Sequence, residues 1–380
     1  MAGSAGNAPT WRSSFPAMGT RVDIIGWGGN GMAIVNAVVG VVARHEDMWS
    51  VFWPSSEVSR LNAAVRDAAI GDGASRCGAD SAHGGPGLVV SEETDRLLRD
   101  ALALAEATGG TFNPLIGPLV AAWDVKAMRA AYVAGVPLPP APAADAVEAA
   151  SRASSWGLLS RVGEQRWAMG VPAESVGGVD VASPRLDLGG IAKGYTADAC
   201  RDLAVSMGAR GVLVSVGTSS VSVFGTRADG SSWRAGLRDP HGGPTSVAGV
   251  VELPAGGMSS LSTSGDNLGP LGGVGVGCAA ERAAESTSDR RARETPRETS
   301  VGGGRVFDHH IIDPRTGYPA HAGVRQVSVV ASSGVLAEAL STALLVEPSI
   351  DVPDVVARWA RVTGAPASAK VVGLVRAAQG

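Results

Sequence analysis

The chain has 380 residues, of which 45% are hydrophobic and 4% aromatic, so it can build one large domain or two packed lobes around Ala, Val and Leu. Its formal net charge of −4, without a cluster of Lys and Arg on a predicted helix, argues against a nucleic-acid partner. Its three cysteines are spaced too irregularly for a disulfide framework or a zinc site.

Targeting and membrane signals do not show in the pattern either. Residues 1–20 lack the basic and apolar regions of a secretory signal, and no cysteine stands where a lipoprotein anchor would. Because the sequence holds no run of 18 apolar residues, we expect no membrane span and predict a cytoplasmic protein.

Hydrophobic periodicity and turn residues predict the following elements. In chain order they are a strand at 20–26, a helix at 32–49, an irregular turn at 51–62, a helix from 91 to about 108, a proline-rich connector at 137–145, a short helix at 146–156, a turn and helix within 186–208, strands at 211–216, 221–224 and 327–331, and a helix at 335–346. Strands and helices do not alternate strictly, so we predict an α+β fold rather than a doubly wound sheet.

The domain organisation follows from the segments that lack periodicity. We expect one domain over residues 15–350, with insertions at about 63–88 and 268–305, because both stretches are rich in small or charged residues and show no period. Residues 1–14 and 351–380 are expected to be terminal extensions.

The first candidate site is the sequence LDLGGIAKGYTAD, from Leu186 to Asp198, which we call the glycine turn. Gly189 and Gly190 allow a ligand to approach the backbone closely, and the free amides of a helix start attract anions. Lys193 adds a positive charge suited to a phosphate or an electron-rich ring. The spacing does not match a P-loop, and an isolated motif of this kind fits a tight strand-to-helix turn equally well.

The second candidate is HHIIDPRTGYP, from His309 to Pro319, a turn signature with two adjacent histidines. A histidine can move protons near neutral pH, and Asp313, three residues after His310, could orient the imidazole. The alternative is a rigid turn whose histidines are polar surface residues.

The third candidate lies on the predicted helix VLAEALSTALLV, from Val335 to Val346. Glu338 and Thr342 are four residues apart and share one face, and Ser341 lies beside them. A carboxylate and two hydroxyls suit Mg²⁺ or Ca²⁺, although the stripe could equally face solvent. Two further segments, FPAMGT at 15–20 and GTFNPLIGPLVAAWD at 110–124, have the small and flexible residues of a pocket for a flat ring, or of ordinary packing.

The order of these motifs along the chain resembles that of the ApbE-like family, the FAD:protein FMN transferases. The resemblance runs from about residue 15 to residue 346, through FPAMGT, SVFWPSSEVSRLN, TFNPLIGPLVAAWD, LDLGGIAKGYTAD, STSGDN, HHIIDPRTG and AEALSTAL. It implies an ApbE-like fold with mixed or antiparallel sheets. It also implies an enzyme that binds FAD, cleaves its pyrophosphate with Mg²⁺ and transfers FMN to a Thr or Ser hydroxyl of an acceptor protein.

The resemblance implies roles for particular residues. His310 would be the catalytic base for the acceptor hydroxyl. The residues implied to contact the cofactor are Met18, Phe52, Thr111, Phe112, Asn113, Asp187, Lys193 and Ile311. The residues implied to bind the metal are Gly190 through its carbonyl, Glu338, Ser341 and Thr342.

The chain departs from the family pattern at several points. Glu338 stands where the family usually has Asp, and Thr218 follows Gly217 where the family usually has a second Gly, while many relatives are exported or membrane-anchored. A longer side chain at 338 could shift the metal, and a side chain at 218 could crowd the ligand. An FAD-binding protein or a metal-dependent FAD pyrophosphatase without transfer activity is therefore an alternative, and a regulatory relative that binds no flavin is a third.

Overall fold

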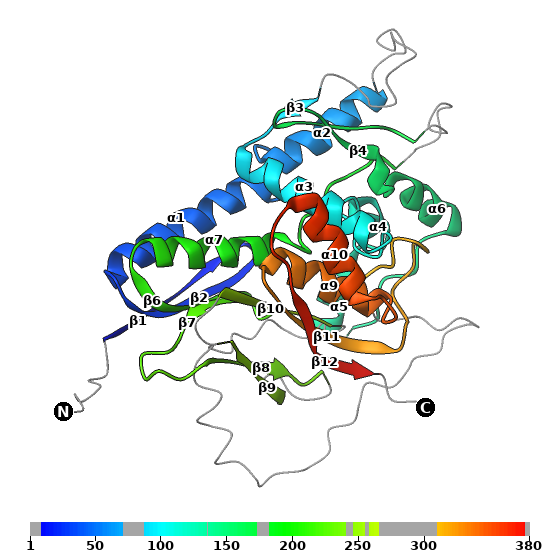
Figure 1. Ribbon diagram of the computed structural model, residues 1–380. Coiled ribbons are helices and arrows are strands. Elements are labelled where there is room, and N and C mark those ends of the chain that lie inside the picture. The colour runs from blue at the N-terminus through cyan, green and yellow to red at the C-terminus, as the bar shows by residue number, and fades with distance from the viewer. Residues whose placement is uncertain are drawn as a thin grey trace, which may run out of the picture.

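The computed structural model describes residues 9–70, 87–134, 136–172, 182–240, 246–254, 258–265 and 310–376. These ranges form three antiparallel sheets with helices packed on them (Figure 1). The largest sheet has seven strands in the order β1-β2-β6-β7-β10-β11-β12. The strands are β1 (Thr10–Ala17), β2 (Thr20–Gly28), β6 (Ala209–Val216), β7 (Ser220–Gly225), β10 (Met258–Gly265), β11 (Val324–Ala331) and β12 (Ala369–Arg376).

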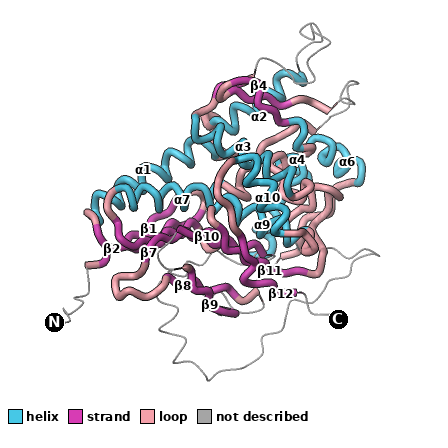
Figure 2. Tube along the Cα trace, viewed as in Figure 1, coloured by secondary structure: helices cyan, strands magenta, loops and turns pink. Residues whose placement is uncertain are grey.

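Helices cover one face of this sheet, and a hairpin covers part of the other. The helices α1 (Gly31–Trp49), α7 (Ala192–Ser206) and α9 (Gly334–Val346) lie along the first face (Figure 2). The hairpin of β8 (Trp233–Arg238) and β9 (Val247–Leu253) packs its Trp233 and Leu253 against the second face. The fold class is thus α+β with antiparallel sheets, as the sequence predicts.

A cap of helices and a small sheet completes the molecule. The three-stranded sheet has the order β3-β5-β4, with β3 (Leu88–Val89), β4 (Leu159–Gly163) and β5 (Arg166–Met169). The helices are α2 (Glu57–Ile70), α3 (Glu92–Ala107), α4 (Gly117–Ala122), α5 (Val125–Ala134), α6 (Ala144–Ala153), the short 3₁₀ turn Trp156–Leu158 and α10 (Val352–Thr363). No helix among the described ranges is apolar over a length that would span a bilayer.

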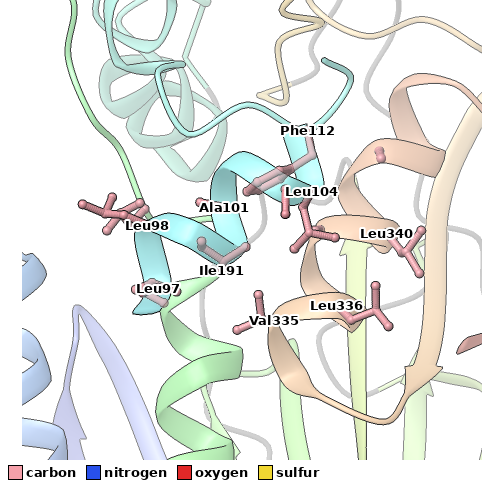
Figure 3. Packing of buried hydrophobic residues seen from close by; sticks show 14 of the residues in the cluster. Leu97, Leu98, Ala101, Leu104, Phe112, Ile191, Val335, Leu336 and Leu340 are labelled. Carbon is pink, nitrogen blue, oxygen red and sulfur yellow. The ribbon is translucent and has the colours of Figure 1, made fainter. Parts of the chain in front are cut away.

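The main core joins the cap to the sheet. It gathers buried side chains of α3, α9 and the glycine turn, and Figure 3 shows Leu104, Ile191 and Leu336 together in it. Burial of such aliphatic side chains contributes about 1.5–3 kcal/mol each, so this contact dominates the attachment of the cap.

Several helix ends follow the sequence signals. The Ser91 hydroxyl accepts a hydrogen bond from the Thr94 amide (3.2 Å), which begins α3 where the capping pattern predicts. The Ser333 hydroxyl caps α9 in the same way, through the Leu336 amide (3.3 Å).

Other expectations are corrected. Residues 57–70, expected to be a turn and a loop, form α2, whose buried Val58 and Leu61 belong to the main core; residues 71–86 of the first expected insertion lie outside the described residues. The expected insertion at 268–305 lies outside them as well.

The prediction of terminal extensions is also wrong for most of the described residues in those two ranges. Thr10–Ala17 pairs with β2 as β1, and Ala369–Arg376 pairs with β11 as β12. The helix α10 buries Val355 and Trp359 in the main core, so the chain after residue 350 is part of the domain.

Candidate active site

The glycine turn is held in a defined shape by its own side chains. The Asp187 carboxylate accepts a hydrogen bond from the Gly189 amide (2.8 Å), and the Lys193 ammonium donates to the Gly189 carbonyl (2.6 Å). Gly189 and Gly190 are exposed, so their backbone is open to a ligand. Asp187, Gly190 and Lys193 therefore form one local unit, as the sequence indicates.

The start of α7 presents backbone donors. The Gly194 amide donates to the buried Glu338 carboxylate (2.8 Å). No described residue accepts a hydrogen bond from the amides of Gly190 or Lys193. Two backbone amides and an ammonium at a helix N-terminus would suit an anion, because the helix dipole adds positive potential there.

Glu338 is the most buried carboxylate of the candidate set, with 4% of its surface exposed. One of its oxygens accepts from Gly194, and the other accepts a short hydrogen bond from the Ser220 hydroxyl. Burial raises the pKa of Glu338, and the positive charge of Lys193 acts in the opposite direction. A cation near this carboxylate would therefore stabilise its ionised form.

The hydroxyls expected at a metal site gather on the same face of the sheet. Ser341 contacts Ser262 (3.1 Å) and Ser264 (2.8 Å), and Ser264 also contacts Thr342 (3.2 Å). Ser262 pairs directly with Ser220, the partner of Glu338, so the register of β7 and β10 brings the carboxylate and the hydroxyls into one layer.

This donor set suits Mg²⁺ in its chemistry. It consists of hard oxygens with one carboxylate, and Mg²⁺ is commonly held by one or two carboxylates together with substrate phosphates. Each Glu338 oxygen accepts one protein hydrogen bond and keeps a lone pair. Among the described residues, no three His, Cys, Asp or Glu side chains form a metal-binding group, so a metal bound here would take its remaining ligands from hydroxyls, carbonyls or phosphate.

Two glycines set how closely α7 and α9 approach. A Cβ atom on Gly194 would overlap the Gly334 carbonyl, and one on Gly334 would overlap the Gly194 carbonyl. The Asp198 carboxylate also accepts from the Gly334 amide (2.6 Å) and from buried Arg201 (2.9 Å). The backbones of the glycine turn and of α9 are thus in direct contact.

The segment 110–114 lies beside the glycine turn. The Asp187 amide donates to the Pro114 carbonyl (2.9 Å), and a Cβ on Gly190 would contact the Phe112 ring at 3.4 Å. The hydroxyl of Thr111 bonds the Thr108 carbonyl (2.9 Å), and the amide of Asn113 bonds the Ser154 carbonyl (2.5 Å). Phe112 is thus adjacent to the turn, whereas Thr111 and Asn113 are buried and hold the segment in shape.

Met18 occupies a strained backbone conformation. It forms the β1–β2 turn with Gly19, and both have positive φ, 51° and 65°. A non-glycine residue with positive φ is uncommon and is often found at a functional site. The Gly217 amide donates to the Arg21 carbonyl (2.8 Å), so Met18 lies at the same end of the sheet as Ser220.

Phe52 and Thr218 are both exposed. Phe52 is 74% exposed on the loop between α1 and α2, with the Lys126 ammonium 5.8 Å from its ring centroid. Thr218 lies at the tip of the β6–β7 turn. Within the described residues, neither side chain is buried against the glycine turn.

The His310 turn is a short hairpin. The Ala320 amide donates to the Ile311 carbonyl (2.9 Å), and Ile312 pairs with Pro319. Arg315 makes three hydrogen bonds to the Asp313 carboxylate, through its amide, Nε and Nη2. The Asp313 carboxylate thus holds Arg315 within the turn, and Ile311 packs against the main core.

Sequence reasoning missed residues that support the site. Asn62 on α2 makes two hydrogen bonds to the Leu186 backbone, from its amide to the carbonyl (3.1 Å) and from the Leu186 amide to its oxygen (2.7 Å). Asn62 stands in the SRLN part of a recognised motif, but its partner is 124 residues away. Ser220 was missed for the same reason, because its partner Glu338 is 118 residues away.

A cavity of about 770 Å³ lies elsewhere, between α3, α7 and α10. It is lined by Arg96, Asp100, Tyr195 and Trp359 among others, and the glycine-turn residues before Tyr195 do not line it. This cavity is thus separate from the candidate site.

The arrangement matches known structures. The fold resembles the flavin transferase ApbE from Vibrio cholerae, with a TM-score of 0.62, 21% identity and 97% coverage of both chains. It also resembles the ApbE protein from Thermotoga maritima, with a TM-score of 0.63, 25% identity and 97% coverage of both chains. These comparisons define an ApbE-type fold.

Sequence comparison then gives the family. The ApbE family model matches residues 18–269 and 296–363, and the chain belongs to the ApbE family. It is 33% identical to the FAD:protein FMN transferase of Treponema pallidum over 267 residues, 68% of this chain and 61% of that protein. It is 30% identical to the enzyme of the same name from Rhodobacter capsulatus over 328 residues, 85% of this chain and 48% of that protein. The chain therefore spans about half to six tenths of the length of these curated relatives.

Proposed function

We propose that this protein is an FAD:protein FMN transferase that attaches FMN to a Ser or Thr hydroxyl of an acceptor protein. The observation that carries the proposal is the start of α7, where the Gly190 and Lys193 amides donate to no described residue and the Lys193 ammonium binds the carbonyl of exposed Gly189. It suits the pyrophosphate of FAD, and the names of the curated relatives agree with it.

In this reaction the acceptor oxygen forms a bond to the phosphorus of the FMN half, and the pyrophosphate bond breaks to release AMP. Lys193 and the amides would bind the phosphates and balance the charge that moves to the leaving group. His310 would accept the hydroxyl proton, a role that commonly contributes about 10²–10⁴-fold. Asp187 would keep the glycine turn in its binding shape.

A divalent cation fits the proposal. Glu338, Ser341, Thr342 and the Gly190 carbonyl would hold Mg²⁺, which would supply charge neutralisation to the pyrophosphate oxygens. Met18 at its strained turn, Phe112 beside Gly190, and Ile311 next to His310 would contact the flavin or adenine rings. Phe52, being exposed, would reach FAD only at the rim of the site.

The first test measures binding. FAD should bind more tightly than riboflavin in calorimetry, because the α7 site addresses phosphates that riboflavin lacks. Equal affinities would remove the phosphate site from the proposal.

The second test measures transfer. The protein is incubated with FAD, Mg²⁺ and candidate acceptor proteins, and covalent flavin is detected by in-gel fluorescence. His310→Ala should keep FAD binding and lose most transfer, whereas the control His321→Ala, a histidine just beyond the same turn, should keep transfer. AMP release without labelled acceptor would instead favour the alternative, a metal-dependent FAD pyrophosphatase, and FAD binding without turnover would favour an FAD carrier.

A further inference from the structure

Trp123 joins two parts of the proposed active site that are far apart in sequence. It follows α4, and its indole N–H donates to the Gly317 carbonyl in the His310 turn (2.8 Å). Its ring also contacts Tyr318 edge-on, with centroids 5.8 Å apart. Trp123 is thus bound to the turn by one hydrogen bond and one ring contact.

The other end of the same segment holds the glycine turn. The Gly117 amide, at the start of α4, donates to the Arg185 carbonyl (3.2 Å), and the Pro114 carbonyl accepts from Asp187 (2.9 Å). A Cβ on Gly117 would overlap the Arg185 backbone, so the contact is close. Residues 114–123 therefore span the distance between the glycine turn and the His310 turn.

The His310 turn is seated by packing as well. Ile312 is buried in a small cluster with Leu119 and Val147, against which Trp123 packs. A Cβ on Gly317 would overlap Ser151 and Val147 on α6, and Gly317 has a φ of 78°. The Gly317 carbonyl is therefore presented in a fixed direction, and the Trp123 N–H meets it there.

On the far side, Arg315 reaches Glu347 beyond α9 at 3.5 Å. Both side chains are more than one third exposed, and such surface pairs contribute little. The hairpin begins one residue after His310, at Ile311, so its orientation sets the direction of the His310 backbone.

We propose that Trp123 is a positioning residue that fixes the His310 turn relative to the glycine turn. The inference rests on the proposed function, because it matters to transfer only if His310 acts there. Loss of the indole N–H would leave the FAD site intact and displace the base, and a displacement of about 1 Å can cost about 10²-fold in rate.

The experiment uses Trp123→Phe, which keeps an aromatic ring and removes the N–H. The control is Trp27→Phe, since Trp27 is also half-buried and donates its N–H to a backbone carbonyl, that of Thr226 (2.7 Å). Trp123→Phe should lower kcat for acceptor labelling about 10–100-fold with FAD affinity unchanged within about twofold, and Trp27→Phe should leave both unchanged.

A double-mutant cycle separates positioning from general destabilisation. In a His310→Ala background, Trp123→Phe should cause no further loss of kcat, because both changes act through the same group. Additive losses, or an equal loss in Trp27→Phe, would overturn the proposal.

If the wild-type protein labels no acceptor, the proposed function fails, and the positioning claim is tested by NMR. Trp123→Phe should shift the His310 ring resonances and increase amide exchange at Gly317 and Ala320, with Trp27→Phe as control. Unchanged resonances and exchange in Trp123→Phe would overturn the positioning claim by itself.

Discussion

The stability of the protein should fall between pH 7.5 and 5 because of His45. This histidine lies on α1 with no exposed surface, and its Nδ1 is 2.9 Å from the Thr196 hydroxyl on α7. The Thr196 hydroxyl donates to the Ala192 carbonyl (2.7 Å), so it accepts from His45. The other ring nitrogen is 3.5 Å from the Glu93 carboxylate, which Arg44 binds through two nitrogens.

Burial lowers the pKa of His45 to about 4 from its ordinary value of 6.5, although Glu93 acts to raise it. Because the folded-state pKa is depressed, the unfolded chain takes up the proton first as the pH falls. The contribution of neutral His45 is therefore complete above pH 6.5 and is lost as the pH falls from 6.5 towards 4. The full loss is about 3 kcal/mol, and about 2 kcal/mol of it falls above pH 5.

The assay is urea unfolding of the wild type and of His45→Gln at pH 7.5, 6.5, 5.8 and 5. The glutamine retains a donor for Thr196 and cannot take up a proton. Most carboxylates titrate below this window, so the difference between the two proteins should shrink by about 2 kcal/mol as the pH falls. A difference that does not change with pH, or an NMR titration of His45 near pH 6.5, would refute the argument and show that Glu93 outweighs burial.

Three further predictions concern the architecture around the glycine turn. Gly194→Ala should lower the free energy of unfolding by roughly 2 kcal/mol or more, because its Cβ would overlap Gly334. The control is Gly40→Ala at an exposed helical position, which should raise the free energy of unfolding by about 0.5–1 kcal/mol. Equal effects of the two variants in thermal unfolding would contradict the close contact between α7 and α9. Asn62→Ala should lower the free energy of unfolding by about 1–3 kcal/mol and weaken FAD binding in calorimetry. Unchanged FAD affinity would mean that the two hydrogen bonds from Asn62 to Leu186 do not shape the site. Glu338→Asp should lose about 1–3 kcal/mol in urea unfolding, because the shorter arm leaves a buried amide unpaired, and a fully stable variant would argue against that role.

The elements that the sequence predicts correctly carry strong local signals. The helix α3 has a serine cap, acids in its first turn and a glycine pair after its end, and its bounds differ from the prediction by one residue at each end. The helix α9 is apolar on most faces because it packs against the sheet, α7 and α3. Where a capping residue and the hydrophobic period indicate the same helix, the local sequence is sufficient to predict that helix.

The elements that it misses depend on partners elsewhere. The strand β10 reads MSSLSTSG, which is poor in β-branched residues, but its alternating serines meet hydroxyls and carboxylates of α7, α9 and β7. The strand β12 lies at the sheet edge and carries only half-buried side chains on its inner positions. β10 therefore lacks a local strand pattern, whereas β12 is rich in Val and was placed outside the domain because it follows the last recognised motif.

The candidate site likewise contains residues that the sequence predicts and residues that it misses. Motif order indicated Asp187, Lys193, Glu338 and His310, but not the groups that hold them in place. Asn62, Ser220 and Trp123 bind backbone or side-chain atoms that are 124, 118 and 194 residues away. Contacts at such separations depend on strand register and helix crossing, which a single sequence does not display.

A polar layer between the sheet and its helices surrounds Glu338. Ser220 and Ser262 face each other across β7 and β10, and each meets a different residue of α9. The Glu338 carboxylate accepts from Ser220 with one oxygen and from the Gly194 amide with the other, so it joins α9 both to β7 and to the start of α7. Glu338 therefore has a specific acceptor role, and because burial raises its pKa, Lys193 or a bound cation would favour its ionised form. It follows that helix packing and charge at the glycine turn are coupled through a single side chain, and changes at Glu338 should alter both together.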